Sequence, residues 1–150
     1  EIGILTGDRR IKTVRDRFRG YCKALEVNGI ERRDNFILEG DFTREGAYRT
    51  AKEYLKNGKM PQAIFTCNNF TTEGFFKAVL EEKLVLGQDI FCMAFDKLEQ
   101  FDMFGLNYSY LERNPWEMGK AAMEMLLERL KNPSILCTRK IIPFHIIMNS

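Results

Sequence analysis

Four times along this chain, a short apolar run typical of a β-strand stops at polar residues, and a helical pattern follows. The runs cover residues 2–6, 36–38, 63–66 and 90–94, and a fifth run closes the chain at residues 141–148. Strands that alternate with helices favour a parallel sheet, because a parallel neighbour can be reached only through a crossover. We therefore predict an α/β fold with an open, mostly parallel sheet and helices on both faces.

Short polar side chains follow these runs at the points where the strands are expected to end. They are Asp8, Asp41, Asn68, Asn69 and Asp96. In an open parallel sheet, ligands bind in the crevice outside the carboxyl ends of the strands. Hydrogen-bonding side chains without a neighbouring nucleophile and base indicate a protein that holds a polar small molecule.

Four helices are expected between and after the strands. The first covers residues 14–25 and is rich in Lys and Arg, Thr43 is the expected N-cap of the second, and the third is expected from about Thr71 to Lys83. The fourth has the clearest start, because residues 114–117 supply a capping Asn, a Pro at the first helical position and a Glu at the third. Its apolar face is expected to consist of Met118, Ala121, Ala122, Met125 and Leu126.

Composition places the chain among ordinary globular proteins. Its 150 residues suit one domain, and a net charge of +2 is too small to indicate nucleic-acid binding by itself. The four cysteines are far apart, and there is no signal peptide or membrane-length apolar run, which favours a reduced, cytoplasmic protein without a membrane partner. The chain opens at Glu1 directly on a strand, so we expect it to be part of something longer.

The motifs of common enzymes are missing from the sequence. It contains no G-x-S-x-G turn for a serine nucleophile, no G-x-G-x-x-G after a strand and no spacing typical of metal ligands. The one histidine, His145, lies in the final apolar run, where a structural role is expected. We therefore predict no catalytic residues, no cofactor and no metal site.

Six segments, taken in order, resemble one protein family. They cover residues 15–29 (with Arg17, Gly20 and Gly29), 39–48, 61–79, 89–96, 113–119 and 146–150. The pattern is similar to the regulatory core of the lactose-repressor/galactose-repressor transcription factors, which are related to periplasmic sugar-binding proteins. The resemblance spans residues 1–150 but corresponds only to the second half of such a repressor. It implies a partial effector-binding domain, mainly the C-terminal lobe, without the DNA-binding headpiece and most of the N-terminal lobe.

The resemblance also implies roles for individual residues. Arg17 is expected to point into the ligand cleft, where it donates to sugar hydroxyls or to an anionic corepressor, and Phe42 is expected to offer an aromatic face. The alternatives are a surface arginine and a buried loop anchor. Asn68, Asn69 and Asp96 are expected to bind hydroxyls at strand ends, with helix capping as the alternative, and Arg113 lies where the family often has Gln. Asn69, Lys97 and Asn149 depart from the usual residues, which leaves the identity of the sugar open.

Three classes of function are compatible with these patterns. The leading hypothesis is the effector-binding lobe of a cytoplasmic, sugar-responsive transcriptional regulator, which contacts DNA only through the missing headpiece. The alternative is the sugar-binding protein of a transport system, which would have the same fold. The third class is a small flavodoxin-like enzyme, which would fit the order of strands and helices. The sequence offers no residues that would carry out its catalysis.

Aromatic residues without an obvious place in the core suggest self-association. Phe101, Met103 and Phe104 follow Asp96 without a regular period, and Phe75 stands beside Phe76, so that both are not expected to face the same core. Grouped exposed aromatics are typical of interfaces, and in the resembling family these segments lie at the two-fold dimer contact. We therefore predict a symmetric homodimer that uses Phe75, Phe101 and Phe104, with a cluster tucked under the loop as the alternative.

Overall fold

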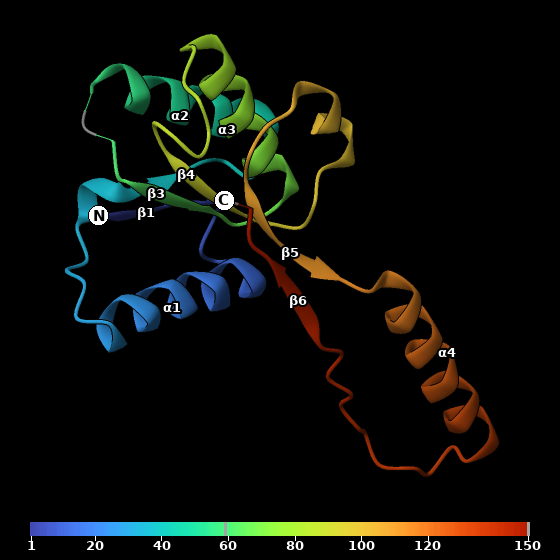
Figure 1. Cartoon of the computed structure of the whole chain (residues 1–150). Helices are drawn as coiled ribbons and strands as arrows, with labels where there is room; N and C mark the ends of the chain where they lie inside the picture. Colours follow the sequence, from blue (N-terminus) through green and yellow to red (C-terminus); the bar gives the residue numbers. More distant parts are fainter. Residues whose placement is uncertain (59, 150) are drawn as a thin grey trace.

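One sheet of six strands organises the molecule, in the order β2-β1-β3-β4-β5-β6 (Figure 1). The computed structural model describes residues 1–58 and 60–149; Ser150, the last residue of the sixth family-like segment, lies outside them. All neighbouring strands are parallel except β5 and β6, which are antiparallel. The predicted open, mostly parallel sheet is confirmed. The strands are β1 (Ile2–Thr6), β2 (Ile37–Glu39), β3 (Ala63–Thr66), β4 (Phe91–Phe95), β5 (Ser109–Arg113) and β6 (Phe144–Ile147).

The helices begin where the sequence provides caps. The side chain of Thr43 accepts a hydrogen bond from the backbone N–H of Gly46, and that of Asn114 accepts one from Glu117. The third helix starts two residues before the expected Thr71, because Asn68 is its N-cap. The helices are α1 (Lys12–Val27), α2 (Arg44–Lys56), α3 (Asn69–Glu81) and α4 (Pro115–Lys131), with short 3-10 turns η1 (Asp34–Phe36) and η2 (Glu99–Phe104).

Helices cover both faces of the sheet, as predicted. Helix α1 lies on one face, where Tyr21 and Leu25 pack with Ile4, while α2 and α3 lie on the other (Figure 1). Burial is deepest at α3, whose residues from Thr71 to Phe76 are all buried, because α3 packs both on β3 and β4 of the sheet and on the neighbouring α2. The larger core is therefore on the side of α2 and α3.

The burial of α3 against both the sheet and α2 corrects one expectation. Phe75 and Phe76 are both buried, with exposed fractions of 1% and 0%, because α3 buries two of its sides at once. Phe101 is half-buried and packs edge-on against Phe76, with ring centroids 5.3 Å apart, whereas Phe104 is 55% exposed. The prediction of Phe75 as an exposed interface residue is wrong, and the loop aromatics partly form the tucked cluster named as the alternative.

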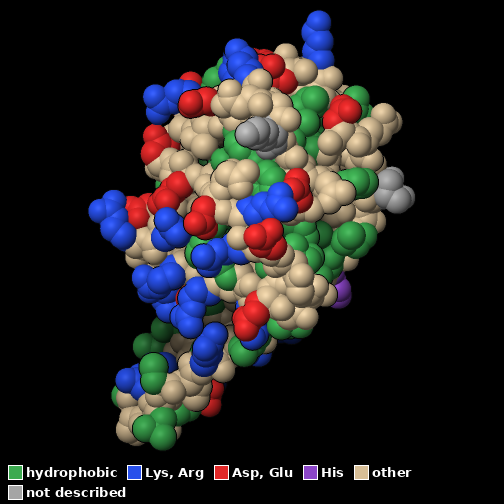
Figure 2. All heavy atoms as spheres, turned by 90° about the vertical axis from the view of Figure 1, so that its left-hand side faces the viewer, with side chains coloured by type: hydrophobic (Ala, Val, Ile, Leu, Met, Phe, Trp, Pro, Cys, Tyr) green, Lys and Arg blue, Asp and Glu red, His purple; other side chains and the backbone are tan. Residues whose placement is uncertain are grey.

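Helix α4 stands away from the rest of the molecule. It projects from the end of β5, and the chain returns through residues 132–143 to β6 (Figure 1). Of the five residues expected on its apolar face, only Ala121 is buried, and hydrophobic side chains are exposed at the protruding end seen at the bottom of Figure 2. Its exposed hydrophobic residues include Trp116, Met118, Met123, Leu126, Leu127 and Leu130.

The basic character of α1 is partly neutralised on the surface. Lysines and arginines alternate with acidic side chains on the face shown in Figure 2, and Lys12 pairs with Asp16 while Lys23 pairs with Glu26. In the part of the chain that the structure describes, no helix is long and apolar enough to cross a membrane. Nor do three or more His, Cys, Asp or Glu side chains gather there as metal ligands would.

Candidate ligand-binding site at the carboxyl edge of the sheet

Several of the predicted polar residues lie together at the edge of the sheet where the parallel strands have their carboxyl ends. Arg17 comes from α1, Asn69 starts α3, Phe95 ends β4, Asp96 follows it, and Arg113 ends β5. Contacts between these side chains, described below, join them into one cluster. We call these five residues the edge site.

Arg17 lies over the ring of Phe95. Its guanidinium carbon is 3.4 Å from the ring centroid, and one of its N–H groups donates to the backbone carbonyl of Cys67, just after β3. A guanidinium stacked on an aromatic face gains about 0.5–2 kcal/mol and keeps its edge available for hydrogen bonds. Arg17 is therefore held over the ends of β3 and β4 and is half-buried.

Asp96 is the shared acceptor of the edge site. Arg113 donates from Nε to Asp96 Oδ1 at 2.6 Å and from Nη2 to Oδ2, and its guanidinium also lies 5.5 Å from the Phe95 ring centroid. In the amide orientation that its neighbours require, Asn69 donates to the Phe95 carbonyl oxygen at 3.1 Å and to Asp96 Oδ2 at 3.3 Å. Asn69, Asp96 and Arg113 are thus brought together at the end of β4, while their part in ligand binding stays a prediction.

Two of the predicted ligand residues adopt an unusual backbone conformation. Phe42 has φ of 67° and Asp96 has φ of 94°, and Lys83 after α3 is the one other non-glycine residue with positive φ in the described ranges. Such conformations cost free energy and concentrate at functional sites, where surrounding contacts hold them in place. The backbone at Phe42 and Asp96 therefore supports a functional role for these positions.

Phe42 and Asn68 each make local structural contacts. The Phe42 ring covers Gly7, where an added Cβ would come within 2.3 Å of Phe42 Cδ2, so it anchors the loop after β1. Asn68 forms a capping box with Thr71, and its buried side-chain nitrogen has no partner among the described residues. These are the structural alternatives named for the two residues, and their part in ligand binding stays a prediction.

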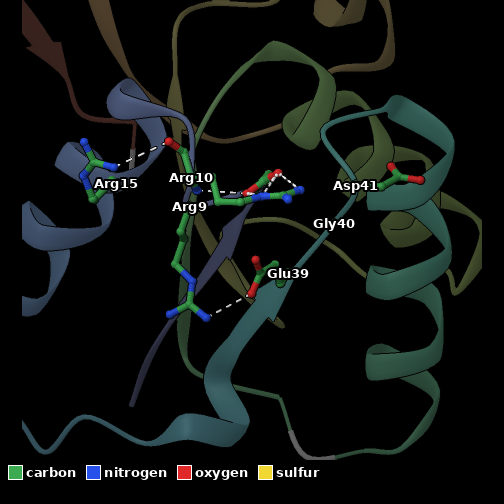
Figure 3. A pocket seen from close by; sticks show the side chains of 7 residues that line it. Arg9, Arg10, Arg15, Glu39, Gly40 and Asp41 are labelled. Atoms are coloured by element: carbon green, nitrogen blue, oxygen red, sulfur yellow. Dashed lines mark hydrogen bonds and ion pairs between the residues drawn. The ribbon is translucent and has the colours of Figure 1, made fainter.

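A charged hollow of about 800 Å³ flanks the edge site at the ends of β1 and β2. Arg9 donates to Glu39, with the two atoms 3.0 Å apart. Arg15 reaches from α1 to the Arg10 carbonyl oxygen (Figure 3). Arg10 donates to both carboxylate oxygens of Asp8, which lowers the pKa of Asp8 to about 2. The acids and bases of this hollow are largely paired with each other.

A second hollow of about 610 Å³ lies on the other side, where β5 and β6 meet the end of β4. Asn69, Asp96 and Arg113 line it together with Lys97 and the exposed His145. The expected structural role of His145 is wrong, because β6 pairs at the margin of the sheet and leaves this side chain in solvent. The edge site therefore forms part of the wall of this second open, polar hollow.

The edge site holds many hydrogen-bond donors and one shared carboxylate. It offers the guanidinium edges of Arg17 and Arg113, the amide of Asn69 and an aromatic face, which together suit a ligand rich in oxygen atoms. Phe95 is the residue that the sequence analysis missed. Phe95 could have been predicted, because it stands directly before Asp96 at the end of an expected strand.

Comparisons with known proteins identify the family. Residues 1–148 match the family described as periplasmic binding protein-like domain. A ribose operon repressor of Haemophilus influenzae is 31% identical over 134 residues, which cover 89% of this chain and 40% of that protein.

Two solved structures show the same fold. A LacI family transcriptional regulator from Enterococcus faecium with bound ribose matches with a TM-score of 0.85 and 19% identity, over 99% of this chain and 55% of that one. The dimeric lac repressor matches with a TM-score of 0.85 and 21% identity, over 99% of this chain and 54% of that one. The chain thus spans about 40% of the length of the curated relative and about half of each solved structure.

Proposed function

Because this chain belongs to the periplasmic binding protein-like domain family, we propose that it is the effector-binding lobe of a sugar-responsive transcriptional regulator. The edge site is the observation that carries this proposal. Its donors and its carboxylate converge at the carboxyl ends of parallel strands, which is where open α/β sheets bind ligands. The effector is a sugar or a sugar-like polyol, whose hydroxyls pair with these groups.

The proposal places this chain as mainly the C-terminal lobe of a longer protein. Its length relative to the ribose operon repressor supports this, and so do the exposed hydrophobic residues of α4. In α4, the side chains of Leu126, Leu127 and Leu130 are about half or more exposed. Short helices gain most of their stability from packing, so an isolated helix of this kind would be unstable in water. The N-terminal lobe would cover α4 and supply the opposite wall of the cleft, and a DNA-binding headpiece would precede it.

Regulation follows from closing the cleft. An effector that contacts both lobes favours the closed arrangement by its differential affinity for the two states. The closed and open arrangements then hold the attached headpieces differently, so that effector binding changes the affinity for DNA. By thermodynamic linkage, DNA binding changes the affinity for the effector by the same factor. A cytoplasmic location is part of the proposal, because the regulator must meet DNA.

The curated relative favours a regulator over a transport protein. It is a repressor, whereas a transport protein would share the fold and the same edge of the sheet. The test uses the full-length polypeptide that carries this chain, titrated with a panel of neutral sugars, sugar phosphates, sugar acids and purine bases while its affinity for upstream DNA is followed by fluorescence anisotropy. A compound that shifts DNA affinity supports the proposal, whereas a full-length polypeptide without a DNA-binding segment contradicts it.

The proposal includes a symmetric homodimer formed through the surface around η2. Phe104 is 55% exposed and lines an apolar hollow of about 520 Å³ with Phe101, Leu80 and Lys77. Phe70 and Leu80 on α3 add further exposed hydrophobic area. A two-fold contact would place this patch against its own copy, so one substitution affects the interface twice.

We expect Phe104→Asp to convert the dimer to a monomer, because the carboxylate would have to be buried without a partner in each half of the contact. Sedimentation velocity on the full-length polypeptide measures the change. Phe91→Asp is the matched control, since Phe91 is 53% exposed at the start of β4, away from η2. A parent protein that is already monomeric, or a Phe104→Asp variant that stays dimeric, removes this interface.

A further inference from the structure

The segment that carries α4 is joined to the sheet through two paired strand ends. The chain leaves the sheet at Arg113, the last residue of β5, and Asn114 is already the N-cap of α4. It returns at Phe144, the first residue of β6, which is the cross-strand partner of Arg113. Figure 1 shows α4 and residues 132–143 extending from these strand ends, away from the helices that cover the sheet. A change in the direction of α4 is therefore centred on Arg113 and Phe144.

The side chain of Arg113 is fixed to the loop after β4. Its Nε donates to Asp96 Oδ1 at 2.6 Å and its Nη2 donates to Oδ2, while its guanidinium carbon lies 5.5 Å from the ring centroid of Phe95. Two parallel hydrogen bonds to one carboxylate fix the direction as well as the distance between the partners. The Asp96 side chain is 17% exposed, so breaking the pair leaves a mostly buried carboxylate without its cation. Asp96 and the end of β5 are therefore held as one unit.

The backbone of Asp96 makes this residue sensitive to the partners of its side chain. Its φ of 94° lies in the left-handed region, which costs a non-glycine residue about 1–3 kcal/mol. The hydrogen bonds from Arg113 and Asn69 to its carboxylate help to hold this conformation in place. A ligand that adds or replaces a hydrogen bond at this carboxylate changes that balance, and Arg113 carries the change to the start of α4.

We propose that Arg113 is a positioning residue, which couples an effector bound at Asp96 to the direction of α4 and thereby to the closing of the cleft. This inference rests on the proposed function and adds the residue through which effector binding is transmitted. Coupling between two sites requires an element with two arrangements, whose equilibrium both sites bias. Here that element is the junction of β5 and α4, which the effector reaches through Asp96 and the N-terminal lobe reaches through α4.

The experiment measures coupling separately from affinity. The probe is the neutral sugar, sugar phosphate, sugar acid or purine base that most strongly shifts the affinity of the full-length polypeptide for upstream DNA. Its dissociation constant is determined by calorimetry with and without that DNA, and the ratio of the two constants is the coupling factor. A loss of effector affinity that is the same in both states leaves this ratio unchanged, so a purely structural role of Arg113 does not alter it.

Three variants are compared with the parent protein. Arg113→Met keeps an apolar side chain against Phe95 but removes both hydrogen bonds to Asp96, whereas the amide of Arg113→Gln is able to donate one. Arg9→Met is the matched control, because Arg9 also pairs with a carboxylate at this edge of the sheet, that of Glu39. Its side chain has nearly the same exposed fraction as that of Arg113, 45% against 43%.

We expect the coupling factor of Arg113→Met to fall to the square root of the parent value or below, which means that half or more of the coupling free energy is lost. Arg113→Gln is expected to lie between Arg113→Met and the parent, and Arg9→Met to stay within about twofold of the parent. A smaller fall in Arg113→Met, no difference between the two Arg113 variants, or an equal fall in Arg9→Met overturns the inference and leaves the proposed function standing. A panel in which no compound shifts DNA affinity contradicts the proposed function itself, and this inference with it.

Discussion

Replacing Phe75 with alanine is expected to lower the free energy of unfolding by about 3–5 kcal/mol, the usual cost of removing a fully buried phenyl ring. Phe75 is 1% exposed, and its ring centroid lies 6.3 Å from that of Phe76 in the core between α3 and the sheet. The substitution leaves a cavity between α3 and the sheet, and neither of these packed layers can move enough to close it. Urea unfolding followed by circular dichroism measures the loss.

Phe104→Ala is the matched control for this prediction. Phe104 is 55% exposed, so the same truncation is expected to cost less than about 1 kcal/mol in a monomer. Comparable losses in both variants would mean that Phe75 does not lie in the core described here. Because a dimer contact at Phe104 would add to its apparent stability, the comparison is made at a concentration where sedimentation shows monomers.

Gly74→Ala is expected to lower the free energy of unfolding by about 1–3 kcal/mol, although alanine is the better helix former. A Cβ at this position would lie 2.5 Å from the carbonyl oxygen of Arg44 and 2.6 Å from the backbone nitrogen of Tyr48. Both are backbone atoms of the facing α2 region, so no side chain can move aside. The helices must separate to accommodate one methyl group.

The control is Gly20→Ala in α1, where an added Cβ meets nothing within 4 Å. There we expect alanine to stabilise the protein by about 0.5–1 kcal/mol, because it restricts the unfolded chain and favours the helix. Opposite signs in the two variants support the close packing of α2 on α3. A Gly74→Ala variant that gains stability, as Gly20→Ala does, contradicts it.

The sheet was largely predictable because its signals are local. Apolar runs mark β1, β3 and β4 within one or two residues, and the caps at Thr43 and Asn114 mark two helix starts. The strand β5 was missed, because Ser-Tyr-Leu-Glu-Arg has little apolar character and owes its conformation to pairing with β4 and β6. Such tertiary pairing leaves no pattern along the chain.

The candidate site was predictable in its residues but not in its contacts. Residues at strand ends pointed to Asn69 and Asp96, since strand order alone places them at one edge. The stacking of Arg17 on Phe95 and the pairing of Arg113 with Asp96 depend on side-chain directions from different elements. The prediction that Phe75 is exposed was wrong for a similar reason, because the sequence does not show that α2 covers a second side of α3.

The most direct test of the proposed binding site is the affinity of the full-length polypeptide for the effector that the compound panel identifies, measured by isothermal calorimetry. We compare the parent protein with Arg17→Ala, Asp96→Ala and the control Arg19→Ala. The edge site predicts that the first two variants each lose at least about 1.4 kcal/mol of binding free energy, a tenfold change, while Arg19→Ala binds like the parent. Unchanged affinity in both Arg17→Ala and Asp96→Ala would contradict the assignment of the effector site to this edge of the sheet.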